Sequence, residues 1–215
     1  MSYINTYLER DIQQLSNVGK LNEFSSFLTY VAARTAQELN YADIANAIGI
    51  TTPTVKAWIS ILQRSGVIAL LEPYHNNISN RLVKRPKLYF MDTGLATYLS
   101  RWQCPQTLEA GAMNGAFLET YVVTEIMKSY MHTGEKAHLH YYHDIDKKEI
   151  DLLIIEENRF YPIEIKKAKH PRYADKNFYA LQRFGLEVQS GLIMCLCDDL
   201  LPANRNNWYC PISVV

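Results

Sequence analysis

The sequence predicts two modules, a helical first half and an α/β second half. The fold class of the whole chain is therefore α+β, with an α/β second domain. Apolar residues recur at helical spacing through much of the first hundred residues. The second half instead has short apolar runs between polar turns, which is typical of strands. The halves also differ in charge: residues 1–105 hold 10 Lys and Arg against 7 Asp and Glu (net +3), and residues 106–215 hold 12 against 15 (net −3).

Composition excludes several classes of protein. The chain has 215 residues, of which 48% are hydrophobic and 20% charged, so it is long and apolar enough to bury a core. It has neither an apolar run of membrane-spanning length nor the apolar stretch of a signal peptide, which predicts a cytoplasmic protein without a membrane partner. The balance of 22 basic and 22 acidic residues excludes a globally basic protein that coats DNA, but not a local basic patch.

The first half is expected to hold helices followed by a hairpin. Gly49 is placed to end one helix, and Thr51 followed by Pro53 is placed to begin the next. Asp92 is expected to cap another helix rather than to act in catalysis. The expected elements are helices at 3–15, 21–37, 41–49 and 51–66, a strand at 67–74, a polar turn at 75–80 and a returning strand at 81–92.

This order predicts a winged helix-turn-helix within residues 1–100, with DNA as the favoured nucleic-acid partner. The second helix of the pair offers few cations, whereas the hairpin adds four within seven residues. The alternatives are a solvated hairpin and a winged helix that binds protein. The candidate nucleic-acid contacts here are Lys56, Arg64, Arg81, Lys84, Arg85 and Lys87.

A linker is expected at 101–112, and a second domain at 113–215. Its pattern predicts one helix, three strands, a second helix and two further strands. The expected bounds are 113–131 for the first helix, 138–143, 149–155 and 160–167 for the strands, 172–184 for the second helix, and 191–197 and 211–215 for the last strands.

Three charged residues on neighbouring strands carry the chemistry that this domain suggests. Glu164 and Lys166 stand two apart on one strand and so share a face, and the hairpin brings Asp151 toward them. Two converging carboxylates favour a shared hard cation, Mg²⁺ or Mn²⁺, held by Asp151 and Glu164. Lys166 is placed to help activate water, Glu119 to assist, and Glu149 is a weaker candidate for the same face.

The alternative for this pattern is an exposed cross-strand ion pair without chemistry. The nearby cations Lys167, Lys169 and Arg172 fit either interpretation, since they can guide a phosphate backbone or simply face solvent.

The segment from Glu119 through IDLLI to PIEIKKAK resembles the PD-(D/E)xK nuclease superfamily, whose fold is restriction-endonuclease-like. Ile150 stands where that motif has proline. The whole chain resembles the C-terminal region, a domain of unknown function, of prokaryotic AAA+-type ATP-binding proteins. The phrases that carry this second resemblance are TYLERDI, FLTYVAARTAQELNYADIANAIGI, TPTVKAWISILQRSGVI, RLVKRPKLYFMDTGLATYL, GAFLETYVVTEI and EIDLLI with PIEIK.

The second resemblance implies an upstream P-loop ATPase module, as part of the same protein or as a partner. The sequence has no GxxxxGK[ST], since Gly19-Lys20 has Gln14 where the first glycine belongs and is followed by Leu21. We therefore expect no ATP site and no ATPase activity in this chain, which would be an excised piece or a natural truncation. Arg10 is a candidate nucleotide contact only in a longer relative.

The leading hypothesis is a nucleic-acid-binding protein with a Mg²⁺-dependent phosphodiesterase site. A second hypothesis is a non-catalytic docking or regulatory module of an ATPase, in which the nuclease fold is vestigial. A third is a winged-helix transcription regulator, which would bind DNA tightly without cleaving it.

Overall fold

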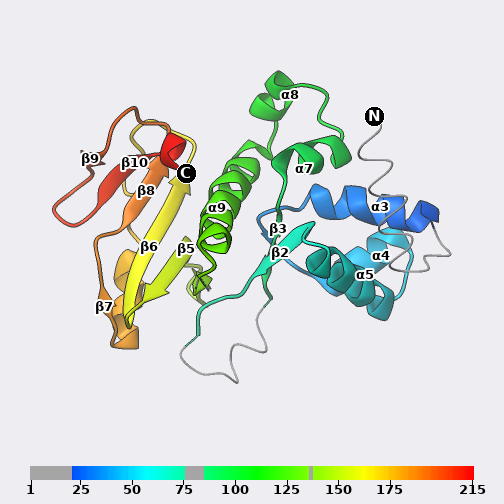
Figure 1. The fold of residues 1–215 in the computed structure, drawn as a ribbon, viewed down its shortest axis with the longest axis horizontal. Coiled ribbons are helices and arrows are strands. Elements are labelled where there is room, and N and C mark those ends of the chain that lie inside the picture. The colour runs from blue at the N-terminus through cyan, green and yellow to red at the C-terminus, as the bar shows by residue number, and fades with distance from the viewer. Residues whose placement is uncertain (1–20, 76–84, 136–137) are drawn as a thin grey trace. The chain divides into compact units, whose positions relative to one another are not determined.

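The structure is a computed structural model that describes residues 21–75, 85–135 and 138–215 (Figure 1). The chain divides into two compact units. Unit 1 comprises residues 1–70 and 88–114, and unit 2 comprises residues 71–87 and 115–215. Unit 2 thus includes residues 71–87, which the sequence had assigned to the first domain. The expected helix at 3–15 and all but the first residue of the turn expected at 75–80 lie outside the described residues.

The order of elements and strands in unit 1 is that of a winged helix-turn-helix. A helix, a short strand and two helices are followed by two strands, and the sheet order is β1-β3-β2. The elements are α3 (Leu21–Ala32), β1 (Gln37–Glu38), α4 (Tyr41–Ile48), α5 (Thr52–Arg64), β2 (Ile68–Leu71), β3 (Lys87–Phe90), α7 (Thr93–Leu99) and α8 (Pro105–Ala110).

Local capping sets the turn between α4 and α5, as predicted. Gly49 has a φ of 79°, in the left-handed region that glycine adopts most easily, and its N–H donates to the carbonyl of Ala45. Thr51 Oγ1 accepts from the backbone N–H of Thr54 at 3.3 Å, and Pro53 lies in the first turn of α5. The cap predicted at Asp92 is also confirmed, since its carboxylate accepts from Leu95 N at 2.9 Å.

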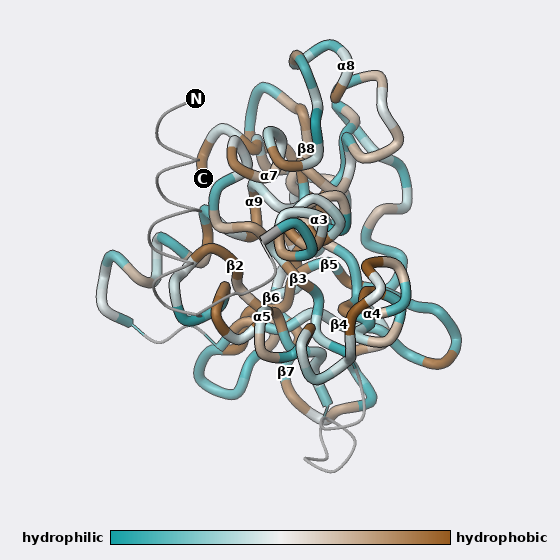
Figure 2. The backbone as a smooth tube through the Cα atoms, turned by 90° about the vertical axis from the view of Figure 1, so that its right-hand side faces the viewer, coloured by the Kyte–Doolittle hydropathy of each residue, from teal (hydrophilic) through white to brown (hydrophobic). Residues whose placement is uncertain are grey.

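The helices of unit 1 pack through an aromatic core. Phe24 and Phe27 of α3 contact Trp58 of α5 with ring centroids 5.1 and 5.2 Å apart. The hydrophobic strand β2, brown in Figure 2, adds the buried side chain of Ile68. The apolar positions that predicted these helices are therefore the positions that form the core.

Unit 2 is a mixed sheet with a long helix, and its strand order is β4-β5-β6-β8-β10-β9, with β7 paired to β6. The hydroxyl of Tyr130 in the helix donates to Glu156 at the end of β5, which ties the helix to the sheet. The elements are α9 (Asn114–Thr133), β4 (Leu139–His143), β5 (Glu149–Glu156), β6 (Arg159–Lys166), η2 (Phe178–Phe184), β7 (Glu187–Val188), β8 (Leu192–Cys195), β9 (Leu201–Pro202), β10 (Trp208–Pro211) and η3 (Ile212–Val214).

Strand β6 pairs with β5 on one side and with β7 and β8 on the other, over different parts of its length. Its first part pairs antiparallel with β5, from Arg159 opposite Glu156 to Ile163 opposite Leu152. Its last part, Ile163–Lys166, pairs in parallel with β8. The start of β5 and the end of β6 therefore lie beyond the stretch that pairs these two strands, and the chemistry-bearing side chains lie there.

Three expected elements differ in the structure. The helix expected at 172–184 is a series of turns followed by the 3-10 helix η2, and Tyr173 near its start has a φ of 55°, outside the α-helical region. The expected linker at 101–112 contains α8, which begins at Pro105. The strand expected at 211–215 lies earlier, as β10, and is followed by η3.

The helix expected at 21–37 ends at Ala32. Ala36 instead adopts a φ of 63°, and its N–H donates to Leu88 of β3 at 2.7 Å. Long-range pairing thus replaces the last helical turn. None of the described helices has both the length and the apolar character needed to cross a membrane.

Candidate functional site

A lysine bridges two carboxylates at the point where β5 and β6 separate. Lys166 Nζ lies 2.6 Å from Glu164 Oε1 and 3.4 Å from Asp151 Oδ2. Asp151 Oδ2 also accepts the backbone N–H of Ile165 at 2.8 Å, so its side chain joins the two strands where their ladder has ended. The structure therefore brings together the three residues that the sequence placed at the centre of the site.

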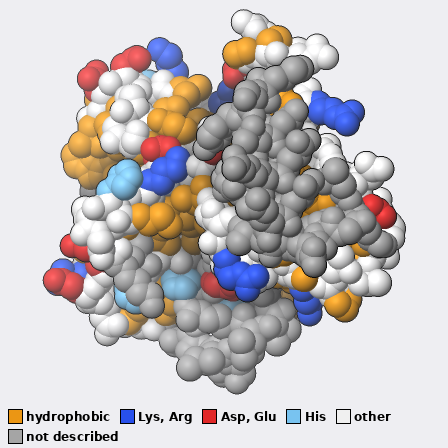
Figure 3. All heavy atoms as spheres, turned by 45° about the vertical axis from the view of Figure 1, so that its right-hand side comes forward, with side chains coloured by type: hydrophobic (Ala, Val, Ile, Leu, Met, Phe, Trp, Pro, Cys, Tyr) orange, Lys and Arg blue, Asp and Glu red, His pale blue; other side chains and the backbone are white. Residues whose placement is uncertain are grey.

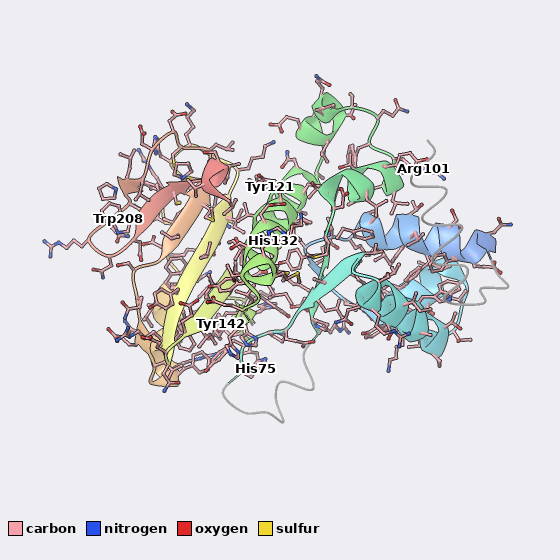
Figure 4. The ribbon with its side chains drawn as sticks, viewed as in Figure 1. His75, Arg101, Tyr121, His132, Tyr142 and Trp208 are labelled. Atoms are coloured by element: carbon pink, nitrogen blue, oxygen red, sulfur yellow. The ribbon has the colours of Figure 1, made fainter. Side chains whose placement is uncertain are left out.

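A second lysine bridges the other two candidate carboxylates. Lys87 Nζ lies 2.9 Å from Glu119 Oε1 and 2.6 Å from Glu149 Oε1. Glu119 comes from α9, two residues before Tyr121, which Figure 4 labels on that helix. Glu149 begins β5, two residues before Asp151 on the same strand. We call these six residues the acidic cluster: Lys87, Glu119, Glu149, Asp151, Glu164 and Lys166.

Lys87 was predicted to contact phosphates from an exposed hairpin, and that prediction is wrong. Its residue surface is only 4% exposed, and its ammonium is directed to Glu119 and Glu149. The sequence did hold a signal for this burial, because Lys87 opens the apolar strand KLYF, whose residues are all buried. Because Lys87 lies next to the hairpin cations in sequence, it was grouped with them and not with Glu119 and Glu149, the carboxylates that it contacts.

Glu164 is the least satisfied member of the acidic cluster. It is 94% buried, and its Oε2 has no hydrogen-bond partner among the described residues. Burial, followed by the neighbouring charge of Asp151, raises the pKa of Glu164 from 4.5 to about 8. Because a buried, unpaired charge is costly, a carboxylate in this position favours the binding of either a proton or a cation.

The two lysines stay charged in this environment. Burial lowers the pKa of Lys166, but the charges of Asp151 and Glu164 raise it by more, so the net shift is upward. Burial likewise lowers the pKa of Lys87, but the negative charges of Glu119, Glu149 and Asp151 raise it by more, so its net shift is also upward. The two ammonium groups therefore lie against the four carboxyl groups of the acidic cluster as lasting positive charges.

The donor set fits Mg²⁺ or Mn²⁺ with few protein ligands. Within the described ranges, no three His, Cys, Asp or Glu side chains are grouped as a ready-made metal site. Mg²⁺ is usually held by one or two carboxylates and keeps several waters or substrate oxygens. Asp151 and Glu164, with the unpaired Glu164 Oε2, match that requirement, whereas soft-metal ligands are absent from the acidic cluster.

The predicted nucleic-acid contacts are divided between the two units. Lys56 and Arg64 are exposed on α5 of unit 1, and Arg85 is exposed in unit 2. Lys167 is half-buried directly after β6, and Arg81 and Lys84 lie outside the described residues. Among the described residues on the face drawn in Figure 3, blue Lys and Arg side chains lie at separate places between other residues.

Comparisons with known proteins match the two halves of the chain separately. Residues 1–106 match a family model described as the domain of unknown function DUF8612, and residues 114–215 match the domain of unknown function DUF4143. DUF4143 is found in C-terminal regions of AAA-type ATPases.

Two mycobacterial proteins are related to the chain in sequence. They are "Uncharacterized protein Mb2031c" of Mycobacterium bovis and "Uncharacterized protein Rv2008c" of Mycobacterium tuberculosis. Each is 28% identical over 169 residues, which is 79% of this chain and 37% of the relative. The matched region thus spans little more than a third of these relatives' length.

Among solved structures, the chain is similar to MepR, a transcription regulator of the Staphylococcus aureus multidrug efflux pump MepA. The TM-score is 0.28 at 22% identity, covering 62% of this chain and 96% of MepR. A point mutant of MepR from a multidrug-resistant clinical isolate gives 0.29 at 19% identity, covering 61% and 89%. Likeness at this level carries no argument about fold or function, so the winged helix of unit 1 rests on its own element order.

Proposed function

We propose that the chain is a nucleic-acid-binding protein whose unit 2 carries a Mg²⁺- or Mn²⁺-dependent phosphodiesterase site. The observation that carries this proposal is the buried Oε2 of Glu164, which lies beside Asp151 and Lys166 and has no hydrogen-bond partner in the described part of the chain. The order of a helix with Glu119, a strand with Asp151 and a strand with Glu164 and Lys166 supports it, because the PD-(D/E)xK nucleases share that order.

Asp151 and Glu164 would hold the cation, and Lys166 would orient and activate the attacking water. When bound, the cation would supply positive charge to the phosphodiester and to the alkoxide that leaves. Asp151 is oriented for its role by the N–H of Ile165, and Lys166 is held by both carboxylates. The raised pKa of Glu164 means that cation and proton compete for it, so cation affinity should rise with pH up to about 8.

Unit 1 would contribute the binding of duplex DNA through α5. This helix occupies the place of the recognition helix in a helix-turn-helix, and it exposes Lys56 and Arg64. Two cations give a modest phosphate contribution, so we expect weak, salt-dependent binding rather than tight recognition. A transcription regulator, the third hypothesis, would instead bind a specific sequence tightly without cleavage.

A docking or regulatory module of an ATPase is the second candidate function. It is favoured by the lysines, since Lys166 already contacts the two carboxylates that would hold a metal and Lys87 contacts the other two of the acidic cluster. The presence of DUF4143 in AAA-type ATPases supports such a partner. In that case the acidic cluster would stabilise unit 2 without binding a divalent cation.

The deciding experiment measures cation binding and cleavage together. Mn²⁺ is titrated calorimetrically into the chain and into the variants Asp151→Asn and Glu164→Gln, and each protein is then incubated with labelled DNA and RNA. The matched control is Asp198→Asn, because Asp198 is an exposed carboxylate paired with Lys169 outside the acidic cluster. We expect binding and cleavage that both site variants lose and the control keeps. Failure of the parent chain to bind Mn²⁺ with DNA present would favour the docking module.

A further inference from the structure

Lys87 reaches the acidic cluster from a part of the chain that the nuclease-like motif does not include. It is the last residue of segment 71–87, which belongs to unit 2 although it precedes α9 in sequence. Its ammonium lies between Glu119 and Glu149, at 2.9 and 2.6 Å, and its side chain is 5% exposed. Lys87 therefore neutralises one half of the acidic cluster from within.

Tyr141 of β4 holds this lysine in place. Its ring centroid lies 5.4 Å from Lys87 Nζ, which is within the range of a cation–π contact. Its hydroxyl donates to the backbone carbonyl of Arg85 at 2.5 Å, two residues before Lys87. Its backbone carbonyl accepts from Tyr74 at 2.7 Å, and Pro73 pairs with Tyr141 as an isolated bridge. The segment that carries Lys87 is thus tied to the sheet at several points.

The two lysines differ in how easily they can leave their carboxylates. Lys166 is the last residue of β6, and its side chain is 41% exposed. It can turn toward solvent or substrate while Asp151 and Glu164 take a cation. Lys87 has no comparable exit, because its side chain is 5% exposed and its ammonium contacts two carboxylates. Among the described residues of the cluster, the unpaired buried oxygen belongs to the Asp151–Glu164 half.

We propose that Lys87 is a built-in cation that fills the Glu119–Glu149 half of the acidic cluster, so that the site takes one divalent cation rather than two. This inference rests on the proposed function, because it assumes that Asp151 and Glu164 bind Mg²⁺ or Mn²⁺. Lys87 is a positioning residue in this scheme: it fixes the direction of Glu119 and Glu149 and sets the charge beside the cation.

The test counts bound Mn²⁺ on the full chain at about pH 8, where about half of the Glu164 carboxyl groups are ionised and the cation can displace the remaining protons. Free Mn²⁺ is measured by its electron paramagnetic resonance signal. We expect one Mn²⁺ per wild-type chain, one for Lys87→Arg, which keeps the charge, and two for Lys87→Met. Lys169→Met, an exposed lysine paired with Asp198, is the control and should bind one.

A folded Lys87→Met variant, checked by circular dichroism, that binds one Mn²⁺ with affinity within about twofold of wild type would overturn the inference. Should Lys87→Met not fold, Glu149→Gln gives an independent test, because Glu149 is 43% exposed in its side chain. The inference expects Glu149→Gln to keep one Mn²⁺, and loss of that ion contradicts it.

The wild-type count separates this inference from the proposed function. Two Mn²⁺ per wild-type chain, with one lost in Asp151→Asn, would leave the phosphodiesterase proposal standing and refute the role of Lys87. No Mn²⁺ bound by wild type, with or without DNA, would refute both.

Discussion

The helix caps of unit 1 and the acidic cluster of unit 2 find their polar partners over very different distances along the chain. In unit 1, Asn40, Thr51 and Asp92 cap helices through backbone groups two or three residues away. In unit 2, Lys87 and Glu119 are 32 residues apart, and Asp151 and Ile165 are 14 apart. Local partners form as soon as the helix does, whereas the acidic cluster exists only when the sheet is complete. Substitutions in the acidic cluster should therefore lower the free energy of unfolding more than substitutions at the helix caps of unit 1.

The largest expected effect is on stability in unit 2. Lys87→Met leaves Glu119 and Glu149 without their shared cation, and we expect the free energy of unfolding to fall by about 3 kcal/mol at neutral pH. Urea unfolding measures this. The matched control is Lys56→Met in unit 1, an exposed lysine whose loss should change stability by at most about 0.5 kcal/mol. A similar decrease in the free energy of unfolding for Lys87→Met and Lys56→Met would contradict the expected difference between the acidic cluster and unit 1.

The next effect is a pH dependence that belongs to Glu164. Its pKa is about 8 in the folded chain against an ordinary 4.5, so the folded chain retains a proton that the unfolded chain releases. The free energy of unfolding should therefore fall as pH rises between these values, by up to about 1.4 kcal/mol per pH unit. Glu164→Gln, which is neutral at every pH, should flatten this slope. Urea titrations with EDTA at about pH 5, 6 and 7 compare it with wild type.

Asp198→Asn, which alters an exposed carboxylate, is the control for that experiment and should keep the wild-type slope. A slope that Glu164→Gln leaves unchanged would show that the pKa of Glu164 is not raised by its surroundings.

A smaller effect is expected at the helix cap of unit 1. Thr51→Ala removes the oxygen that accepts from Thr54 N, and should lower the free energy of unfolding by about 1 kcal/mol. Thr51→Ser keeps the hydroxyl and should restore most of that loss. Thermal or urea unfolding distinguishes the two variants, and equal losses would show that the cap contributes nothing through its hydroxyl.

The smallest effect concerns DNA binding by α5. Lys56→Met should weaken binding about equally on all duplexes and reduce the slope of log affinity against log salt by about 1. Fluorescence anisotropy over a salt series measures this. Lys128→Met, in an ion pair with Glu125 on α9, should leave the slope unchanged. A change in preference among duplex sequences without a change in slope would point to base contact instead.

Alternation along β5 and β6 was sufficient to predict which central residues share the site. Glu164 and Lys166 lie on one face because strand side chains alternate, and the short turn between the strands brings Asp151 close to both. The helix-turn-helix was predictable from equally local signals, since Gly49 and Thr51 act within one turn of themselves. Glu119 was placed on its helix, but its partner Lys87 was not found.

Some local structure also could not be predicted from the sequence. Residues 172–184 have helical spacing, yet Asp175 accepts hydrogen bonds from the side chains of Asn204 and Asn207, and the chain forms turns before η2. Propensity over a short window is weak, and long-range contacts of this kind override it.

The sequence by itself determined the caps at Gly49, Thr51 and Asp92, the apolar faces and the face shared by Glu164 and Lys166, because each depends on residues a few positions apart. Only the tertiary structure decided that Lys87 is buried against Glu119 and Glu149 and that Glu164 keeps an unpaired oxygen. Burial and the approach of charges from distant segments set these properties. No local pattern contains them, since they arise where separate strands and a helix meet.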